Sequence, residues 1–220
     1  TPIPILGKMF RYLANQTKTN ICCHVDHGYT LDECYEGIDS GFTSVMFDGS
    51  KLTLKENINI SKKIVSRAHK YNISVEGEIG FVGYDNGKIS EGTNIEDAVT
   101  FANQSNIDAM AISVGNTHLQ TSKKASIDFN KINLIEAKTK IPLVLHGSSG
   151  IPVEQRKKLA RKTKVAKLNI GTEIRMTFGE ALRKNLKNNP KTYDRLQLLK
   201  PTIKDLTKVT KKIIKQIGPN

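Results

Sequence analysis

The sequence contains no tryptophan, few aromatic residues and only three cysteines. Aromatic residues are 6% of the 220 residues, and none lies between basic residues in the pattern that stacks nucleic-acid bases. Cys22, Cys23 and Cys34 cannot all pair within one chain and form no C-x-x-C motif. We therefore expect reduced thiols in a cytoplasmic protein and not a disulfide framework.

Long apolar runs are also absent. No segment approaches the roughly 18 apolar residues that a membrane span requires, so we expect no membrane partner. The N-terminal segment Thr1–Ala14 lacks the order of charge, apolar run and small cleavage site of a signal peptide. It also lacks a starting Met, so we expect a processed or partial chain.

Acidic residues are few relative to basic ones. The chain has 34 Lys and Arg against 21 Asp and Glu, a net charge of +13. Only 7 of the basic residues are Arg, and the 27 Lys are spread along the chain, most densely in its last third. Proteins that bind nucleic acid usually cluster Arg with aromatics. We favour solvated Lys faces over a nucleic-acid site.

Short apolar segments alternate with amphipathic ones. Six segments are rich in Val, Ile, Leu and Met and predict strands buried on both faces: Asn20–Val25, Ser44–Asp48, Ser74–Ile79, Ala109–Val114, Leu143–His146 and Val165–Ile170. Helical periodicity follows in Glu56–Lys70, Ile95–Gln104, Ile151–Lys162 and Pro201–Ile217. The strand ends recur about every 29 residues, which is typical of serial βα units.

A parallel βα series allows an open doubly wound sheet or a closed (β/α)₈ barrel. No G-x-G-x-x-G motif follows the first predicted strand, which argues against a dinucleotide site. Polar side chains at the strand ends indicate a ligand site, because ligands bind at the carboxyl ends of strands in both folds.

Three of the five histidines, His27, His118 and His146, lie at such ends. Three imidazoles can bind Zn²⁺ and leave a fourth position open. One strand-end histidine alone is more often structural, but three at successive ends favour a metal site. His24, inside a predicted strand, and His69, inside a predicted helix, are interpreted as hydrogen-bonded core or interfacial histidines.

Carboxylates accompany these histidines. Asp26 precedes His27 where the chain leaves the strand, and a carboxylate beside a metal suits acid/base catalysis; the alternative is an Asp that caps the next turn. Asp48 and Glu78 could be further metal ligands or orient the histidines. Turn formation and salt bridging remain equal alternatives for both.

The last two predicted strand ends resemble anion sites. His146–Gly150 is rich in Gly and Ser, and Asn169–Thr172 lacks bulky side chains apart from Ile170. The loops after the last two strands of a (β/α)₈ barrel commonly bind phosphate through backbone N–H groups.

Six segments together resemble the class II, zinc-dependent ketose-bisphosphate aldolases. They occur in the family's order over roughly positions 20–180 and read HVDHG, GFTSVMFDGS, SVEGEIG, SVGNTH, PLVLHGSSGIP and AKLNIGTEIR. The resemblance implies a (β/α)₈ barrel, of which this chain supplies about six βα units (strands 3–8) and the C-terminal helices, as one N-terminally incomplete domain over residues 1–220.

The resemblance also implies a reaction and a set of site residues. The reaction is cleavage of fructose or tagatose 1,6-bisphosphate to dihydroxyacetone phosphate and glyceraldehyde 3-phosphate, in a homodimer or homotetramer with Zn²⁺ and a monovalent cation. His27, His118 and His146 would bind zinc, Asp26 would handle the C4 hydroxyl proton, and Asp48 and Glu78 would form an alternative metal position. The substrate-binding residues would be Gly147, Ser149, Asn169, Ile170, Gly171, Thr172 and Arg195, the last from a neighbouring subunit.

Two positions depart from the family pattern. Leu119 stands where the family has Gly after the second zinc histidine, and Asn86, beside Asp85, stands near the family's catalytic loop glutamate. These departures keep open a degenerate homologue that binds sugar phosphate with little turnover. A different zinc barrel enzyme, such as a hydrolase, is a third hypothesis, which the two phosphate loops disfavour.

Overall fold

A computed structural model describes residues 2–84, 90 and 92–218. Asp85 and Asn86 lie outside these residues. The chain divides into two compact units. The first comprises Thr1–Phe81, Ser90–Val114 and Asp128–Val144, and the second comprises Val82–Ile89, Gly115–Ile127 and Leu145–Asn220.

The strands form one six-stranded sheet in the order β1-β2-β3-β4-β5-β6. Their bounds are β1 His24–Gly28, β2 Ser44–Phe47, β3 Ser74–Ile79, β4 Ala109–Ile112, β5 Leu143–Leu145 and β6 Val165–Leu168. The pairs from β1–β2 to β4–β5 are parallel. Sequential parallel pairing confirms the α/β class and is consistent with part of a (β/α)₈ barrel.

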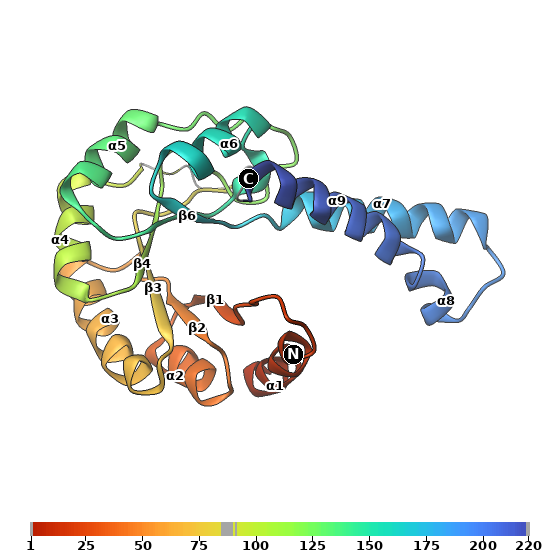
Figure 1. The fold of residues 1–220 in the computed structure, drawn as a ribbon, viewed down its shortest axis with the longest axis horizontal. Coiled ribbons are helices and arrows are strands. Elements are labelled where there is room, and N and C mark those ends of the chain that lie inside the picture. The colour runs from red at the N-terminus through yellow and green to blue at the C-terminus, as the bar shows by residue number, and fades with distance from the viewer. Residues whose placement is uncertain (1, 85–89, 91, 219–220) are drawn as a thin grey trace. The chain divides into compact units, whose positions relative to one another are not determined.

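In the first unit, one helix precedes the first strand and the others follow strands. They are α1 Ile3–Asn15, α2 Leu31–Asp39, α3 Leu54–Ala68, the 3₁₀ turn η1 His69–Tyr71, α4 Ile95–Ser105 and α5 Phe129–Lys138. Figure 1 shows α2, α3 and α4 along one face of the strands in this unit. Capping boxes begin α2 at Thr30 and α3 at Thr53, where the side chains satisfy backbone N–H groups that the first turn leaves unpaired.

The core of the first unit is apolar on both sides of the sheet. All four residues of β2 are buried, as expected for a strand covered on both faces. Met46 packs with Ala111 and Val144 in one cluster. Val45 points the other way, toward Gly37 of α2, where an added Cβ would lie 3.1 Å from the Val45 side chain.

The second unit contains the 3₁₀ turn η2 Ser148–Gly150 and helices α6 Val153–Lys162, α7 Thr172–Asn188, α8 Arg195–Leu199 and α9 Thr202–Ile217. Helices α7 and α9 lie side by side (Figure 1). The predicted apolar stripe of α9 is only partly buried, since Ile213 is 6% exposed and Ile203 60% exposed.

Three predicted boundaries are wrong. The first strand begins at His24 and ends at Gly28, so Asp26 and His27 belong to the strand and do not follow it. Helix α3 ends at Ala68, and His69 begins η1. Helix α6 begins at Val153 and not at Ile151, with Pro152 as its N-cap.

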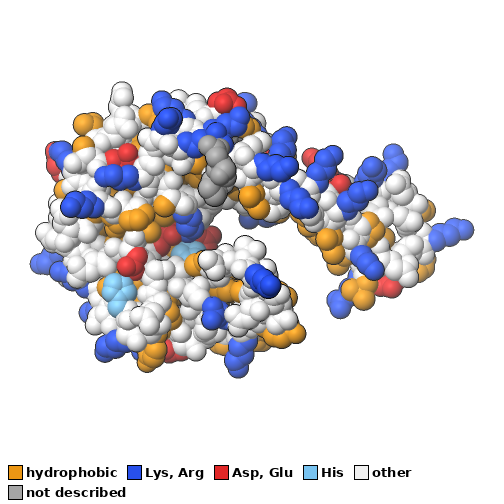
Figure 2. All heavy atoms as spheres, viewed as in Figure 1, with side chains coloured by type: hydrophobic (Ala, Val, Ile, Leu, Met, Phe, Trp, Pro, Cys, Tyr) orange, Lys and Arg blue, Asp and Glu red, His pale blue; other side chains and the backbone are white. Residues whose placement is uncertain are grey.

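Surface charge follows the pattern expected of solvated lysines. On the face shown in Figure 2, Lys and Arg are spread over both units among acidic and uncharged side chains. Among the described residues, no helix combines the length and apolar character needed to cross a membrane.

Candidate active site

In the first unit, three predicted site residues meet at the ends of neighbouring strands. His27 Nδ1 lies 2.8 Å from Asp48 Oδ2 and 3.8 Å from Glu78 Oε2. One ligand atom from each of the three residues lies within 4.8 Å of the others. The cluster is well shielded, because the side chains of His27, Asp48 and Glu78 are 18%, 9% and 2% exposed.

A local irregularity in β1 turns His27 toward this cluster. The register between β1 and β2 shifts between Val25 and Gly28, and His27 has a φ of 56°. A non-glycine residue in the left-handed region is uncommon and marks backbone that the surrounding structure holds in place. The irregularity interrupts the regular pairing of β1 with β2 at Asp26 and His27.

The charges in the cluster bias its protonation. Burial disfavours the imidazolium, but the hydrogen bond to Asp48 and the charges of Asp26, Asp48 and Glu76 outweigh it and raise the pKa of His27. Burial likewise opposes the charged form of Asp48, yet hydrogen bonds from His27 and Ser50 lower the pKa of its carboxyl group. The cluster therefore favours a positive charge beside its carboxylates.

These donors fit a metal ion. Imidazole nitrogen and carboxylate oxygen both bind Zn²⁺, and two shielded carboxylates are unfavourable without a nearby cation. Among the described residues, Asn57 supports the position of Glu78, since its Nδ2 donates to the Glu78 carbonyl at 2.8 Å. Asp48 also makes the turn contacts of the alternative interpretation, because its Oδ1 accepts from Ser50 N and Oγ.

In the second unit, the two remaining predicted zinc ligands lie together. The rings of His118 and His146 are 5.7 Å apart at their centroids and nearly perpendicular. Tyr84 stacks on His118 with centroids 5.1 Å apart. Asn116 Nδ2 donates to the His146 carbonyl at 3.0 Å, which ties the segment after β4 to the end of β5.

The two predicted phosphate segments also lie in this unit, and we call them the phosphate loops: residues 147–150 and residues 169–172. Ser148 N donates to the Asn169 carbonyl at 3.0 Å, and Asn169 N donates to Leu145 O at 2.9 Å. Gly171 precedes the 17-residue helix α7, which begins at Thr172. The N-terminus of a helix favours anions.

Gly147 is required by both backbone angle and space. Its φ is 62°, and a Cβ there would overlap the Thr117 carbonyl oxygen. Ser149 is buried, and its Oγ accepts from Glu173 N at 3.1 Å. Ile170 lies between β6 and α7, and Arg195 begins the short helix α8 with an exposed side chain.

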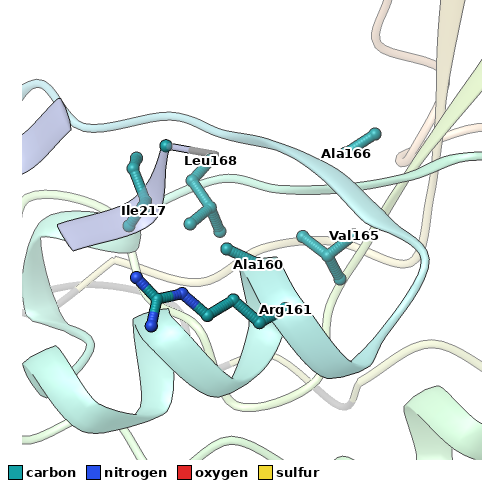
Figure 3. Close-up of a pocket in the computed structure, with 7 residues that line it drawn as sticks. Ala160, Arg161, Val165, Ala166, Leu168 and Ile217 are labelled. Atoms are coloured by element: carbon teal, nitrogen blue, oxygen red, sulfur yellow. The ribbon is translucent and has the colours of Figure 1, made fainter. Parts of the chain in front are cut away.

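The second unit also holds a pocket of about 340 Å³ beside β6. Figure 3 shows its largely apolar lining and the single guanidinium of Arg161. No predicted site residue lines it, and it offers no carboxylate or imidazole. We conclude that this pocket is not the site of the chemistry.

With these clusters placed, comparison with known proteins decides the family. The sequence model of the class-II fructose-bisphosphate aldolases matches residues 1–220. The chain belongs to this family. Its members act as lyases on sugar phosphates, which confirms the aldolase prediction at the level of reaction class.

Among relatives of this aldolase, a 6-phospho-5-dehydro-2-deoxy-D-gluconate aldolase of Shouchella clausii is 37% identical over 201 residues, 90% of this chain and 68% of that protein. A fructose-bisphosphate aldolase of Staphylococcus aureus is 34% identical over 202 residues, 90% of this chain and 70% of that protein. The crystal structure of the YdjI aldolase from Escherichia coli K12 matches with a TM-score of 0.81 and 27% identity, covering 99% of this chain and 76% of that one.

Several residues of this aldolase that support the site were not predicted from the sequence: Asn57, Tyr84, Arg156 and Glu173. Asn57, Arg156 and Glu173 lie on helices, outside the strand ends where the search for function concentrated. Asn116 was part of a strand-end motif but received no role. A fully buried arginine has no sequence signal in an Arg- and Lys-rich helix such as α6.

Leu119, where the resemblance implies a glycine, has left-handed backbone. Its φ is 57°, a conformation that glycine adopts freely and that costs other residues free energy. Leu119 is 54% exposed. The backbone of this aldolase is therefore left-handed at a residue that carries a large side chain.

Proposed function

We propose that this aldolase cleaves a ketose phosphate by a zinc-dependent retro-aldol reaction that releases dihydroxyacetone phosphate and an aldehyde. Two observations carry the proposal: one unit holds a shielded imidazole with two carboxylates, and the other holds the phosphate loops and a histidine pair. We propose that His27, His118 and His146 bind the zinc ion together, and that Asp48 and Glu78 form an alternative metal position. A monovalent cation, a cytoplasmic location, a homodimer or homotetramer and a single incomplete barrel domain with strands 3–8 belong to the same proposal.

Breaking the bond between C3 and C4 of the substrate leaves negative charge on an enediolate. Zn²⁺, when bound, supplies the Lewis-acid charge that such a species requires. Asp26 is the group that takes the proton from the C4 hydroxyl. Its side chain is exposed in β1, and its charge is close enough to raise the pKa of His27.

The phosphate loops orient the substrate. Backbone N–H groups of Gly147, Ser149 and residues 170–172, together with the side chain of Asn169, are proposed to bind the phosphate of dihydroxyacetone phosphate, assisted by the N-terminus of α7. Holding the phosphate fixes the reacting carbons relative to Asp26, and such positioning contributes strongly to rate. Arg195 is proposed to reach the far end of a substrate bound in a neighbouring subunit.

Two kinds of substrate are proposed, which differ in the group at the end of the molecule away from dihydroxyacetone phosphate. One is fructose or tagatose 1,6-bisphosphate, which carries a second phosphate. The other is 6-phospho-5-dehydro-2-deoxy-D-gluconate, which carries a carboxylate and is supported by the name of a relative 37% identical to this chain. Both place a phosphate next to the ketone, so the phosphate loops suit either one.

The test is a coupled assay that detects dihydroxyacetone phosphate from each substrate, with and without a chelator. We expect turnover that the chelator abolishes and zinc restores. Asp26→Asn should lower turnover by about 10²–10⁴-fold, whereas Asp32→Asn, an exposed residue of α2, should leave it unchanged. Chelator-resistant turnover would contradict the zinc proposal.

A second candidate is a homologue that binds sugar phosphate with little turnover, and the left-handed Leu119 favours it. For this candidate, zinc-loaded protein would bind dihydroxyacetone phosphate in calorimetry but would exchange its C3 proton slowly in deuterated water. Restoring a carboxylate with Asn86→Glu should then raise the exchange rate, as followed by NMR.

A further inference from the structure

Arg156 of α6 is completely buried, with 0% of its side chain exposed. Its Nε donates to the Ile151 carbonyl at 2.9 Å, and its Nη2 donates to the Ser149 carbonyl at 2.8 Å. Nη2 also donates to Glu173 Oε2 at 2.6 Å. Within the part of the chain that the structure describes, its Nη1 is buried without a hydrogen-bond partner.

These contacts join the two phosphate loops. Ser149 belongs to the first loop, and Glu173 follows the second loop in the first turn of α7. A second link runs in parallel, because Glu173 N donates to Ser149 Oγ at 3.1 Å. The guanidinium therefore holds one backbone oxygen of the first loop, another directly after that loop, and a carboxylate beside the second loop.

A contribution to folding stability alone does not explain a buried arginine at this position. Burying a charged group costs free energy of desolvation, and apolar residues of similar volume often stabilise a fold equally well. What a planar guanidinium adds is fixed geometry, because its N–H groups diverge at set angles to several acceptors. Such a group suits a site where two loops must keep one spacing.

The charges around Glu173 also support a role for Arg156 at the phosphate loops. Glu173 lies two residues after Gly171, so its carboxylate would repel a phosphate bound at the second loop. Arg156 pairs with that carboxylate at 2.6 Å, and Lys123 Nζ lies 3.6 Å from its other oxygen. The two cations offset the repulsion that Glu173 would otherwise cause.

We propose that Arg156 is a positioning residue, which acts through Ser149 and Glu173 to hold the two phosphate loops at the spacing that binds a substrate phosphate. This inference rests on the proposed function and deepens it. Arg156 itself is not assigned a contact with substrate.

The test measures binding of dihydroxyacetone phosphate by calorimetry to zinc-loaded full-length chain, for wild type, Arg156→Met and Arg156→Lys. We expect the dissociation constant to rise about 10- to 100-fold in Arg156→Met, as when geometry at a binding site is displaced. Arg156→Lys keeps the positive charge but loses the planar guanidinium. Its dissociation constant should lie between those of Arg156→Met and wild type. Arg161→Met is the matched control, since Arg161 is an exposed residue of the same helix, and it should bind like wild type.

A purely structural role predicts a different pattern. Loss of folded protein lowers the number of sites and the maximal rate but leaves the dissociation constant and the KM of the remaining molecules unchanged. The positioning role raises both constants, while zinc content by elemental analysis stays the same. If Arg156→Met does not fold, Arg156→Lys decides the question by itself.

Two results would overturn the inference, and they differ. Binding within about twofold of wild type in the folded Arg156 variants would remove the positioning role and leave the proposed function standing. Failure of the zinc-loaded wild-type chain to bind dihydroxyacetone phosphate would remove the proposed function and, with it, a role for Arg156 in phosphate binding.

Discussion

The left-handed backbone at Leu119 predicts an unusual order of stability among its variants. A residue with a Cβ in this conformation costs about 1–2 kcal/mol relative to ordinary backbone, and glycine does not carry that cost. We therefore expect Leu119→Gly to be more stable than Leu119→Ala. At most positions glycine is the less stable of the two.

The magnitude follows from the surroundings of the side chain. Leu119 is 54% exposed, and full burial of a leucine contributes about 1.5–3 kcal/mol, so truncation costs about 1 kcal/mol in either variant. Glycine then loses about 0.5–1 kcal/mol more than alanine, because its unfolded chain has more freedom. Relief of about 1–2 kcal/mol at a left-handed φ exceeds this loss. The Gly variant should be more stable than the Ala variant by about 0.5–1 kcal/mol and should lie within about 1 kcal/mol of wild type.

The assay is equilibrium unfolding in urea, monitored by circular dichroism. The free energies of unfolding are compared between variants whose dependence on urea concentration has the same slope. Leu134 of α5 is the control, because it is 49% exposed on helical backbone. There, Leu134→Gly should be less stable than Leu134→Ala by about 1 kcal/mol. If Leu119→Ala proves as stable as Leu119→Gly, the backbone at this position is not left-handed and the reasoning fails.

Three further predictions concern metal, thiols and acid stability. His146→Ala should remove most of the zinc that elemental analysis finds in wild type, whereas His69→Ala should not, since the His69 ring instead pairs with Asp108 at 3.0 Å; equal zinc in both variants would contradict the ligand assignment. Cys22 is exposed and should react first with a thiol reagent in the native protein. Cys34 should react only on unfolding, because burial and the charge of Glu33 raise its pKa to about 12, which leaves about one Cys34 in ten thousand as thiolate at pH 8. Modification of Cys34 in the native protein, detected by peptide mass, would refute this prediction. Burial disfavours the charged Glu173 carboxyl, but Arg156 and Lys123 outweigh it and lower its pKa below 4.5, so its stabilising contribution is complete above pH 4.5 and is lost as the pH falls through the lower folded value. Glu173→Gln should therefore show less loss of melting temperature below pH 4.5 than wild type, and an unchanged pH profile would show that the pair with Arg156 does not contribute.

The sequence by itself determined the order of elements and the identity of the residues that carry chemistry. Apolar runs such as Ser74–Ile79 agree with the observed strand at both ends, because burial on both faces of a parallel sheet selects continuous Val, Ile and Leu. The pattern of Asp, His and Gly near the strand ends was visible for the same reason, since parallel strands bring their carboxyl ends to one edge. Glu78 and Asp48 were found in this way, and they do meet His27.

Only the tertiary structure decided the local geometry and the supporting contacts. The shift in β1 that turns His27 toward Asp48 depends on pairing with β2, and the sequence of β1 alone predicts a strand that ends at Val25. Asn57 and Arg156 reach their partners across 21 and 17 residues of chain, and no local periodicity encodes such a contact. Leu119 looked like a simple change of side chain until its φ showed that the backbone there is left-handed. Contacts between distant segments form only when helices pack on the sheet, so the residues that support a site emerge with the fold, whereas the residues that perform the chemistry are visible in the chain itself.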